Sequence, residues 1–403
     1  MSETRLTKVV IIGIGGGAGR VVRKISTLLP GAVIRPMDEV GSSDEQWINL
    51  VYMDSDIADL DYIRGVVHAP IGTEWTHGMG TGGDSLLGEN LLWTHLKDLE
   101  GIVSGAELVI TICCLGGGTG SGGIQVLNRY LNEKKILNIA FATEPLTAEG
   151  TVRKDISDAA IAALKRQSAL LINIHNDLIF KYVPSTTKLT EALKKTNALI
   201  AEGILGLAEA VRCRKGIPLK FVDLQRSIWE RQTNCSIGTG IASGEGRAKS
   251  VVDELLKAPL LGGAEFLQES HKIIAILSGD ENLSVQDIER CHQELSSWLQ
   301  PNTETLIGIS TEEKTDQLKL SVLAIKYLDF EDPIHIKSLS SVPKADPQDL
   351  IESDDDAADD EIEVSGTLGI FGNSASTIRR NENLDIPTFI RRGVALERPE
   401  KKL

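Results

Sequence analysis

Short apolar runs, rich in β-branched residues, alternate with longer stretches of helical periodicity along the first half of the chain. Residues 8–14 (KVVIIGI) and 48–56 (INLVYMDSD) are such runs, and ELVITICC, KILNIAFAT and SALLINIH follow. Short runs that are apolar throughout are typical of strands buried on both faces of a parallel sheet. The alternation predicts an α/β fold with a doubly wound, mainly parallel sheet.

A long helical pattern divides this region from a second one. Residues 190–213 carry apolar side chains at helical spacing and predict one central helix. A second α/β region follows, with strands expected in KIIAILSG, ETLIGIS and LKLSVLAI. Between the first two, Ser284 is expected to cap a helix, with Asp287 three residues on. We therefore expect a first domain of residues 1–189, the central helix, and a second domain of residues 214–330.

The apolar pattern stops near residue 330. Residues 345–363 hold ten acidic residues and no basic residue, and these acids account for most of the net charge of −15. Such a segment repels itself, so residues 331–380 are predicted to form a disordered, acidic linker. In residues 381–403 an apolar pattern returns within NLDIPTFIRRG, which is typical of a peptide that folds on a partner.

Composition narrows the classes of function. The acidic balance argues against nucleic acid as a partner. The five cysteines show neither metal-ligand spacing nor a paired framework, which indicates reduced thiols in the cytoplasm. The amino terminus lacks a signal-peptide pattern, and the apolar runs are too short to span a bilayer. Direct membrane insertion is therefore not expected, and contact with a membrane should go through a partner.

Three glycine-rich segments follow predicted strands: residues 13–19 (GIGGGAG), 78–83 (GMGTGG) and 116–122 (GGGTGSG). Glycine lets backbone amides converge on one ligand, and a helix that begins there adds the positive end of its dipole. Thr119 and Ser121 would place hydroxyls at such a helix start. One such loop could be a tight turn without a ligand, but three together predict a phosphate site.

Two common nucleotide motifs fit poorly. The segment GIGGGAG matches the dinucleotide fingerprint G-x-G-x-x-A, which needs an acid about 20 residues further on. Asp54 and Asp56 come about twice as far along, and the other glycine loops stay unexplained. A Walker A loop would need a Gly-Lys-[Ser/Thr] ending, which none of the glycine segments supplies. A dinucleotide-dependent oxidoreductase remains a disfavoured alternative.

Several segments, in order, resemble those of the tubulin/FtsZ family, and FtsZ-type members in particular. GGGTGSG resembles the signature loop, GIGGGAG the first nucleotide loop, and GMGTGGDSLLG the loop near the γ-phosphate. TEPLTAEGTVR, HNDLIF, IGTGIASGEGRA and APLL resemble later segments, so the resemblance covers most of residues 8–328. It implies a divergent FtsZ-like fold that binds GTP or GDP, with Mg²⁺ held through the phosphates rather than by protein ligands.

The resemblance also implies which residues contact the nucleotide. They are Gly15, Gly16, Gly17, Gly19, Arg20, Asp56, Gly80, Thr81, Gly82, Gly116, Gly117, Gly118, Thr119, Gly120, Ser121, Glu149, Arg153, Asn176, Leu193 and Asn197. Three positions depart from the family pattern. Arg20 and Asp54 stand where asparagine is usual, and Leu193 replaces an aromatic residue that stacks on guanine.

The resemblance further implies head-to-tail filaments, in which the loop after the central helix completes the neighbour's catalytic centre. Here that loop reads PLKFVD. Asp223 would act on the next subunit, whereas Pro218 and Lys220 replace an asparagine and an aspartate of the family pattern. We therefore expect a slow GTPase, in which Lys220 either stabilises transition-state charge, strengthens the filament contact or points to solvent. The alternative is a nucleotide-dependent polymer scaffold that barely hydrolyses GTP.

The end of the chain, NLDIPTFIRR, resembles the family's peptide for proteins that tether filaments to the membrane. The implied contact residues are Leu384, Asp385, Ile386, Pro387, Phe389, Ile390 and Arg391. Together these features predict a filament-forming cell-division protein of the Z-ring type, located at the division site beneath the inner membrane.

Overall fold

The computed structural model describes residues 8–29, 48–62, 66–179, 182–184, 186–211, 216–217, 219, 225, 233–311, 316–327, 378–379 and 382–383. The chain forms two compact units, Met1–Glu352 and Ser353–Leu403. In the second unit the described residues are two short antiparallel strands, β12 (Ile378–Arg379) and β13 (Glu382–Asn383). The first unit carries the sheet and the helices discussed below.

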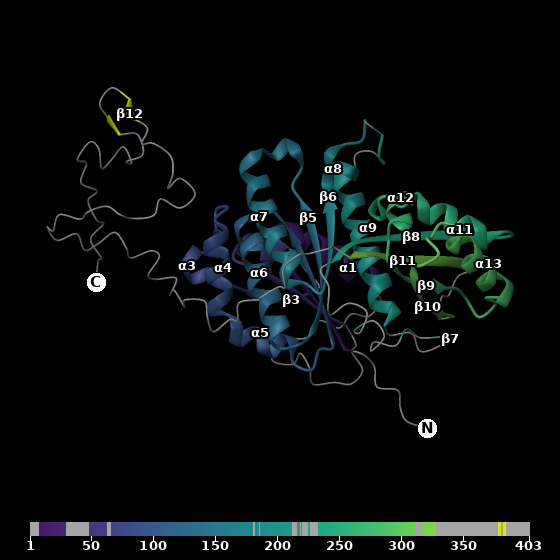
Figure 1. The fold of residues 1–403 in the computed structure, drawn as a ribbon. Helices are drawn as coiled ribbons and strands as arrows, with labels where there is room; N and C mark the ends of the chain where they lie inside the picture. The colour runs from purple at the N-terminus through teal and green to yellow at the C-terminus, as the bar shows by residue number, and fades with distance from the viewer. Residues whose placement is uncertain are drawn as a thin grey trace. The chain divides into compact units, whose positions relative to one another are not determined.

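Six parallel strands form the first half of the sheet (Figure 1). Their order across the sheet is β3-β2-β1-β4-β5-β6. The strands are β1 (Val9–Ile14), β2 (Ile48–Asp54), β3 (Val67–Pro70), β4 (Leu108–Cys114), β5 (Leu137–Glu144) and β6 (Leu170–His175). This order makes the sheet doubly wound, as the alternating pattern predicted, with chain reversal between β1 and β4.

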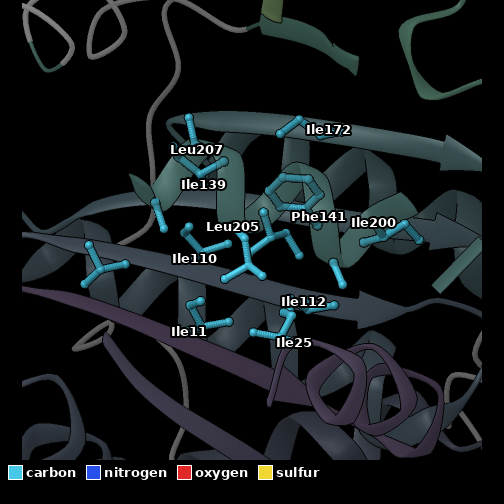
Figure 2. Close-up of a cluster of buried hydrophobic side chains, with 14 of the residues drawn as sticks. Ile11, Ile25, Ile110, Ile112, Ile139, Phe141, Ile172, Ile200, Leu205 and Leu207 are labelled. Atoms are coloured by element: carbon cyan, nitrogen blue, oxygen red, sulfur yellow. The ribbon is translucent and has the colours of Figure 1, made fainter. Parts of the chain in front are cut away.

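Helices cover both faces of these strands, because successive side chains of each buried strand point to opposite sides. Ile11 of β1 contributes to one hydrophobic cluster and its neighbour Ile12 to the other. The first cluster includes α1 (Gly16–Leu28), α2 (Ile57–Tyr62) and α9 (Leu189–Ala210), and Figure 2 shows its isoleucines meeting Phe141 and α9. The second cluster includes α4 (Ser85–Thr94), α5 (Leu96–Val103), α6 (Gly118–Glu133) and α7 (Thr151–Gln167).

Shorter helices lie in the connections. They are α3 (Thr73–Thr76), the 3₁₀ turn η2 (Thr147–Glu149) and α8 (Asn176–Ile179). Within the described residues, no helix has the length and apolar composition needed to cross a membrane.

The second half of the sheet has mixed strand directions. Its order is β8-β11-β9-β10-β7, for β8 (Thr233–Ser243), β11 (Gln317–Tyr327), β9 (Lys272–Ser278), β10 (Glu304–Ser310) and β7 (Gly216–Ile217). The helical elements here are α11 (Arg247–Leu256), η3 (Pro259–Leu261), α12 (Ala264–Gln268) and α13 (Val285–Ser296). One residue pair, Ile172 with Cys235, joins β8 to β6 in the first half.

The structure confirms the predicted α/β fold and most of its elements. The central helix covers Leu189–Ala210, close to the expected 190–213. Ser284 and Asp287 form the expected capping box, in which the Asp287 amide donates to the Ser284 hydroxyl at 3.1 Å. The strand prediction missed β8, whose sequence TNCSIGTGIAS is interrupted by small and polar residues. Gly240 is required there because a Cβ atom would lie 2.1 Å from the Val251 carbonyl oxygen of α11.

Helices α4 and α6 approach so closely that their contact surface is built from glycine and serine. A Cβ atom on Gly122 would lie 1.9 Å from the carbonyl oxygen of Ser85, and one on Gly88 would lie 2.3 Å from that of Gly118. Backbone thus packs on backbone along this contact. Part of the glycine content in GGGTGSGG therefore serves helix packing, a role that the sequence alone did not separate from ligand binding.

We predict that Gly122→Ala lowers the free energy of unfolding by about 2–3 kcal/mol, because overpacking forces the two helices apart. Gly101→Ala on α5 is the matched control, since its Cβ would meet nothing within 4 Å. That control should raise the free energy of unfolding by about 0.5–1 kcal/mol through helix propensity. Urea denaturation of both variants measures the difference, and equal stabilities would contradict the packing account.

Candidate functional site

The carboxyl ends of β1 and β4 mark the point where the chain reverses its direction across the sheet. Helix α1 leaves β1 toward one face and α6 leaves β4 toward the other. The edge of a doubly wound sheet where helices diverge in this way is where such proteins bind their ligands. The first and third glycine segments predicted from the sequence both lie here.

The loop after β1 makes direct contact with the start of α6. Gly15 has a φ of 82°, in the region that favours glycine, and its amide donates to the Met53 carbonyl at 3.0 Å. A Cβ atom on Gly15 would lie 3.0 Å from the Gly120 amide nitrogen. The two loops therefore depend on glycine to approach each other. Gly16 and Gly17 follow in the first turn of α1, and a Cβ on Gly17 would meet the Cys114 side chain at 2.4 Å.

Gly19 lies deeper in the same helix. A Cβ atom there would lie 2.6 Å from the ring of Tyr52, so this glycine seats α1 on β2. Arg20, the next residue, is exposed. Its guanidinium is close enough to Cys114 to lower the pKa of that thiol, although burial raises that pKa more strongly.

The loop after β4 contains glycines of two kinds. Gly116 has a φ of 96°, and its amide donates to the Ser121 hydroxyl at 3.0 Å. At Gly118 a Cβ atom would lie 2.2 Å from the Thr81 hydroxyl oxygen, so protein packing excludes a side chain. Gly117 differs, because a Cβ there would meet nothing within 4 Å. Backbone at Gly117 is thus open beside the first-turn amides of α6, which have no acceptor within their own helix.

A chain of buried hydroxyls connects the loop after β2, the loop of residues 78–83 and the start of α6. The Ser55 hydroxyl lies 2.7 Å from that of Thr119, which lies 3.2 Å from that of Thr81. Thr76 secures the arrangement by donating to the Ser55 carbonyl at 3.0 Å. The Gly80 amide donates to the same carbonyl at 3.3 Å. Gly82 has a φ of 60° and open space around its Cβ direction.

Two aspartates follow β2 with different roles. Asp54 is 2% exposed; its Oδ1 accepts from the Ser55 amide at 2.8 Å and the Asp56 amide at 3.3 Å, and its Oδ2 accepts from the Tyr52 hydroxyl. Burial raises the pKa of Asp54 to about 6, against hydrogen bonds that lower it. Asp56 is half-buried and accepts from the Ala58 amide at 2.8 Å, at the start of α2.

The carboxyl ends of β5 and β6 carry the predicted ribose-side residues. Arg153 forms an ion pair with Glu149 at 2.7 Å, and Glu149 also accepts from the Leu146 amide at 2.8 Å. A Cβ atom on Gly116 would lie 3.1 Å from the Cβ of Arg153, so this pair lies beside the loop after β4. Asn176 begins α8, and its side-chain carbonyl oxygen is buried with no hydrogen-bond partner among the described residues.

Leu193 and Asn197 lie four residues apart on α9, and both are half-buried. Helix α8 contacts α9, as does α1. The predicted residues Pro218, Lys220 and Asp223 lie outside the described residues. So do the predicted partner-binding residues of the carboxyl-terminal peptide, from Leu384 to Arg391.

Sequence reasoning did not single out Ser55, which joins the loops through its hydroxyl, or Tyr52, which supports both Gly19 and Asp54. The signal available for Ser55 was its place between two acids at a strand end. No comparable signal marks Tyr52, because a tyrosine within an apolar strand is an ordinary core residue. Among the residues that the structure describes, no three His, Cys, Asp or Glu side chains are grouped to hold a metal ion.

Glycine loops at the switch point of a doubly wound sheet define an α/β protein of the phosphate-binding class. Residues 8–184 match the model of the Tubulin/FtsZ family GTPase domain, and residues 234–326 match that of the FtsZ family C-terminal domain. The chain belongs to the tubulin/FtsZ family, as a divergent FtsZ-like member. Members of this family are GTPases.

Two curated relatives agree with this assignment. Cell division protein FtsZ 1 of Archaeoglobus fulgidus is 26% identical over 319 residues, which cover 79% of this chain and 82% of that protein. Cell division protein FtsZ of Coxiella burnetii is 24% identical over 317 residues, covering 78% of each. None of these matches supports an oxidoreductase.

Solved structures share the fold. An FtsZ dimer from M. jannaschii has a TM-score of 0.68 at 22% identity, covering 82% of this chain and 95% of that one. CetZ2 from Haloferax volcanii, solved as a GTPγS-bound protofilament, has a TM-score of 0.62 at 18% identity, covering 81% and 95%.

We predict that Asp54→Asn stabilises the protein at neutral pH. Asparagine keeps the two backbone bonds through Oδ1, and its amide can donate to the Tyr52 oxygen. Because the folded pKa of about 6 exceeds the ordinary value of 3.8, the native state holds the proton longer, and Asp54 lowers stability as pH rises from about 4 to 6. The Asp54→Asn variant has no such carboxylate to ionise. Its free energy of unfolding should therefore exceed that of the parent protein by about 2–3 kcal/mol at pH 7.5, and by little at pH 4.

Urea denaturation at pH 4.5, 6 and 7.5 measures this difference between Asp54→Asn and the parent protein. Asp253→Asn, at an exposed position of α11, controls for the loss of one negative charge. A variant that is less stable than the parent protein at pH 7.5 would show that the charged form of Asp54 is the one that the fold favours.

Proposed function

We propose that this chain binds GTP and GDP at the carboxyl ends of β1 and β4, polymerises head to tail, and hydrolyses GTP slowly. The observation that carries this proposal is the meeting of three glycine loops at the switch point, with open backbone at Gly117. Family membership supports guanine as the base. We assign residues 1–189 as the GTP-binding domain, 190–213 as the central helix and 214–330 as the second domain.

The phosphates would be held by the amides at the starts of α1 and α6. These helix starts offer donors without intrahelical partners and the positive ends of two dipoles. Gly117 gives a phosphate room to approach. The hydroxyls of Ser55, Thr81 and Thr119 are the hard oxygen groups that suit Mg²⁺ and its waters, with the metal held mainly through the phosphates.

The ribose and base would lie toward β5, β6 and the start of α9. Glu149 and Arg153 offer charged hydrogen-bonding groups beside the loop after β4. The unpartnered carbonyl oxygen of Asn176 needs a donor, which the nitrogen-bearing edge of guanine supplies. Asn197 can bond the base edge, and Leu193 would cover its face without aromatic stacking.

Assembly is supported by apolar side chains exposed around the same edge. Met79, in the loop of residues 78–83, is 75% exposed; Leu86, which follows that loop, is 58% exposed, and Ile57, beside Gly78, is 47% exposed. Burying them against a second copy would remove apolar surface from water. The CetZ2 protofilament and the FtsZ dimer show that proteins of this fold form such assemblies.

Slow hydrolysis follows from the loop PLKFVD. Asp223 leaves one carboxylate to orient the attacking water on the neighbouring subunit, where the family pattern supplies two. Lys220 would bring a positive charge toward the neighbour's γ-phosphate and could stabilise transition-state charge there. The peptide from Leu384 to Arg391 would tether filaments to membrane-bound division proteins at the division site.

We predict that Gly117→Ala leaves folding intact and weakens GTP and GDP binding at least about tenfold, because a methyl group enters the phosphate approach. Thermal unfolding without nucleotide should match the parent protein, since the added Cβ meets nothing within 4 Å. Titration of a fluorescent guanine nucleotide measures the affinity, with Gly101→Ala as control. Unchanged affinity would place the phosphate elsewhere.

Sedimentation with GTP, GDP and a non-hydrolysable GTP analogue, run beside phosphate release, tests the whole proposal. We expect polymer with GTP and the analogue, and phosphate release slower than that of FtsZ proteins. Lys220→Asp should raise the release rate, and Asp223→Asn should abolish release while leaving nucleotide binding unchanged. Polymer without release would favour the scaffold alternative, and polymer that forms equally with and without nucleotide would refute the proposal.

A further inference from the structure

The carboxylate of Asp59 lies against the phosphate loop itself. Asp59 belongs to α2, which packs on α1, and a Cβ atom on Gly16 would lie 2.0 Å from its Oδ2 and 3.0 Å from its Cγ. Gly16 is the first residue of α1. At Gly80 of the second loop the Asp56 side chain is the nearest group as well, but at 3.6 Å, so the approach of a carboxylate is much closer at Gly16.

Within the part of the chain that the structure describes, no cationic side chain pairs with this carboxylate. Among the described residues, Asp59 forms neither an ion pair nor a side-chain hydrogen bond, and its backbone amide donates to Asp56 at 3.4 Å. Its negative charge also adds, after burial, to the raised pKa of the neighbouring Asp54.

A negative charge at this place opposes a second one. Amides at the start of a helix favour an anion, and Asp59 already places a negative charge near them without accepting a hydrogen bond from them. A nucleotide phosphate that approaches the same amides would lie within a few ångströms of Asp59. Two like charges that come this close in the partly buried environment of a protein surface repel each other.

We propose that Asp59 sets the nucleotide affinity of this protein by competing with a phosphate group for the amino end of α1. The inference rests on the proposed function, because it concerns the same site. It makes Asp59 a determinant of affinity that weakens the binding of GTP and GDP alike. Asp59 lies in the first turn of α2, where an acid stabilises the helix. If that were its main role, substitution would loosen the segment next to the loop and weaken nucleotide binding.

The test compares nucleotide affinity of the full chain in excess Mg²⁺, by titration calorimetry with GTP and with GDP. Asp59→Asn keeps the shape of the side chain and removes its charge, and Asp59→Ala removes the group. Asp61→Asn is the matched control, because it removes the same charge from an exposed position two residues on in the same helix. We expect both Asp59 variants to bind at least about tenfold tighter than the parent protein, a change of about 1.4 kcal/mol.

Each outcome of these titrations has one interpretation. Tighter binding by both Asp59 variants, with Asp61→Asn unchanged, supports the competition. Unchanged or weaker binding by Asp59→Asn and Asp59→Ala overturns it while leaving the proposed GTP site intact. An equal gain in Asp61→Asn also overturns it, because the effect would then come from net charge. Absence of binding by the parent protein and all variants would refute the nucleotide site and the inference together.

Discussion

The close approach of two loops at the switch point is the constraint on which the site depends. Gly15 and Gly120 touch through backbone, so β1 and β4 can end side by side while their helices leave toward opposite faces. Any side chain at Gly15 would separate the loops, because its φ of 82° and the 3.0 Å spacing both exclude one. This contact therefore sets how close the starts of α1 and α6 can lie.

The glycines of the third loop serve either helix packing or access for a ligand, and the sequence alone does not show which glycine serves which role. Gly118 and Gly122 have no side chain because α4 and its preceding turn lie against them. Gly117 has no such neighbour, and space remains in front of it. A single glycine-rich segment thus packs α6 against α4 and leaves open space in front of Gly117 at the start of that helix.

Much of the fold was predictable because its signals are local. Buried parallel strands read as apolar runs, and the capping box at Ser284 and Asp287 is a short-range pattern. Strand β8 was missed because it contains glycines that are needed for close packing against α11, a contact that the sequence of the strand does not reveal. The loops of the site were found through their glycines. Ser55, Tyr52 and Asp59 were not, since their importance comes from residues brought near only by folding.

Strand pairing between the two halves of the sheet is limited, among the described residues, to Ile172 with Cys235. The Thr233 hydroxyl adds a hydrogen bond to the Ala169 carbonyl at 3.5 Å across the same boundary. The central helix α9 packs on strands of both halves. Apolar contacts with this helix therefore join the two halves where the hydrogen-bonded ladder between β6 and β8 is short.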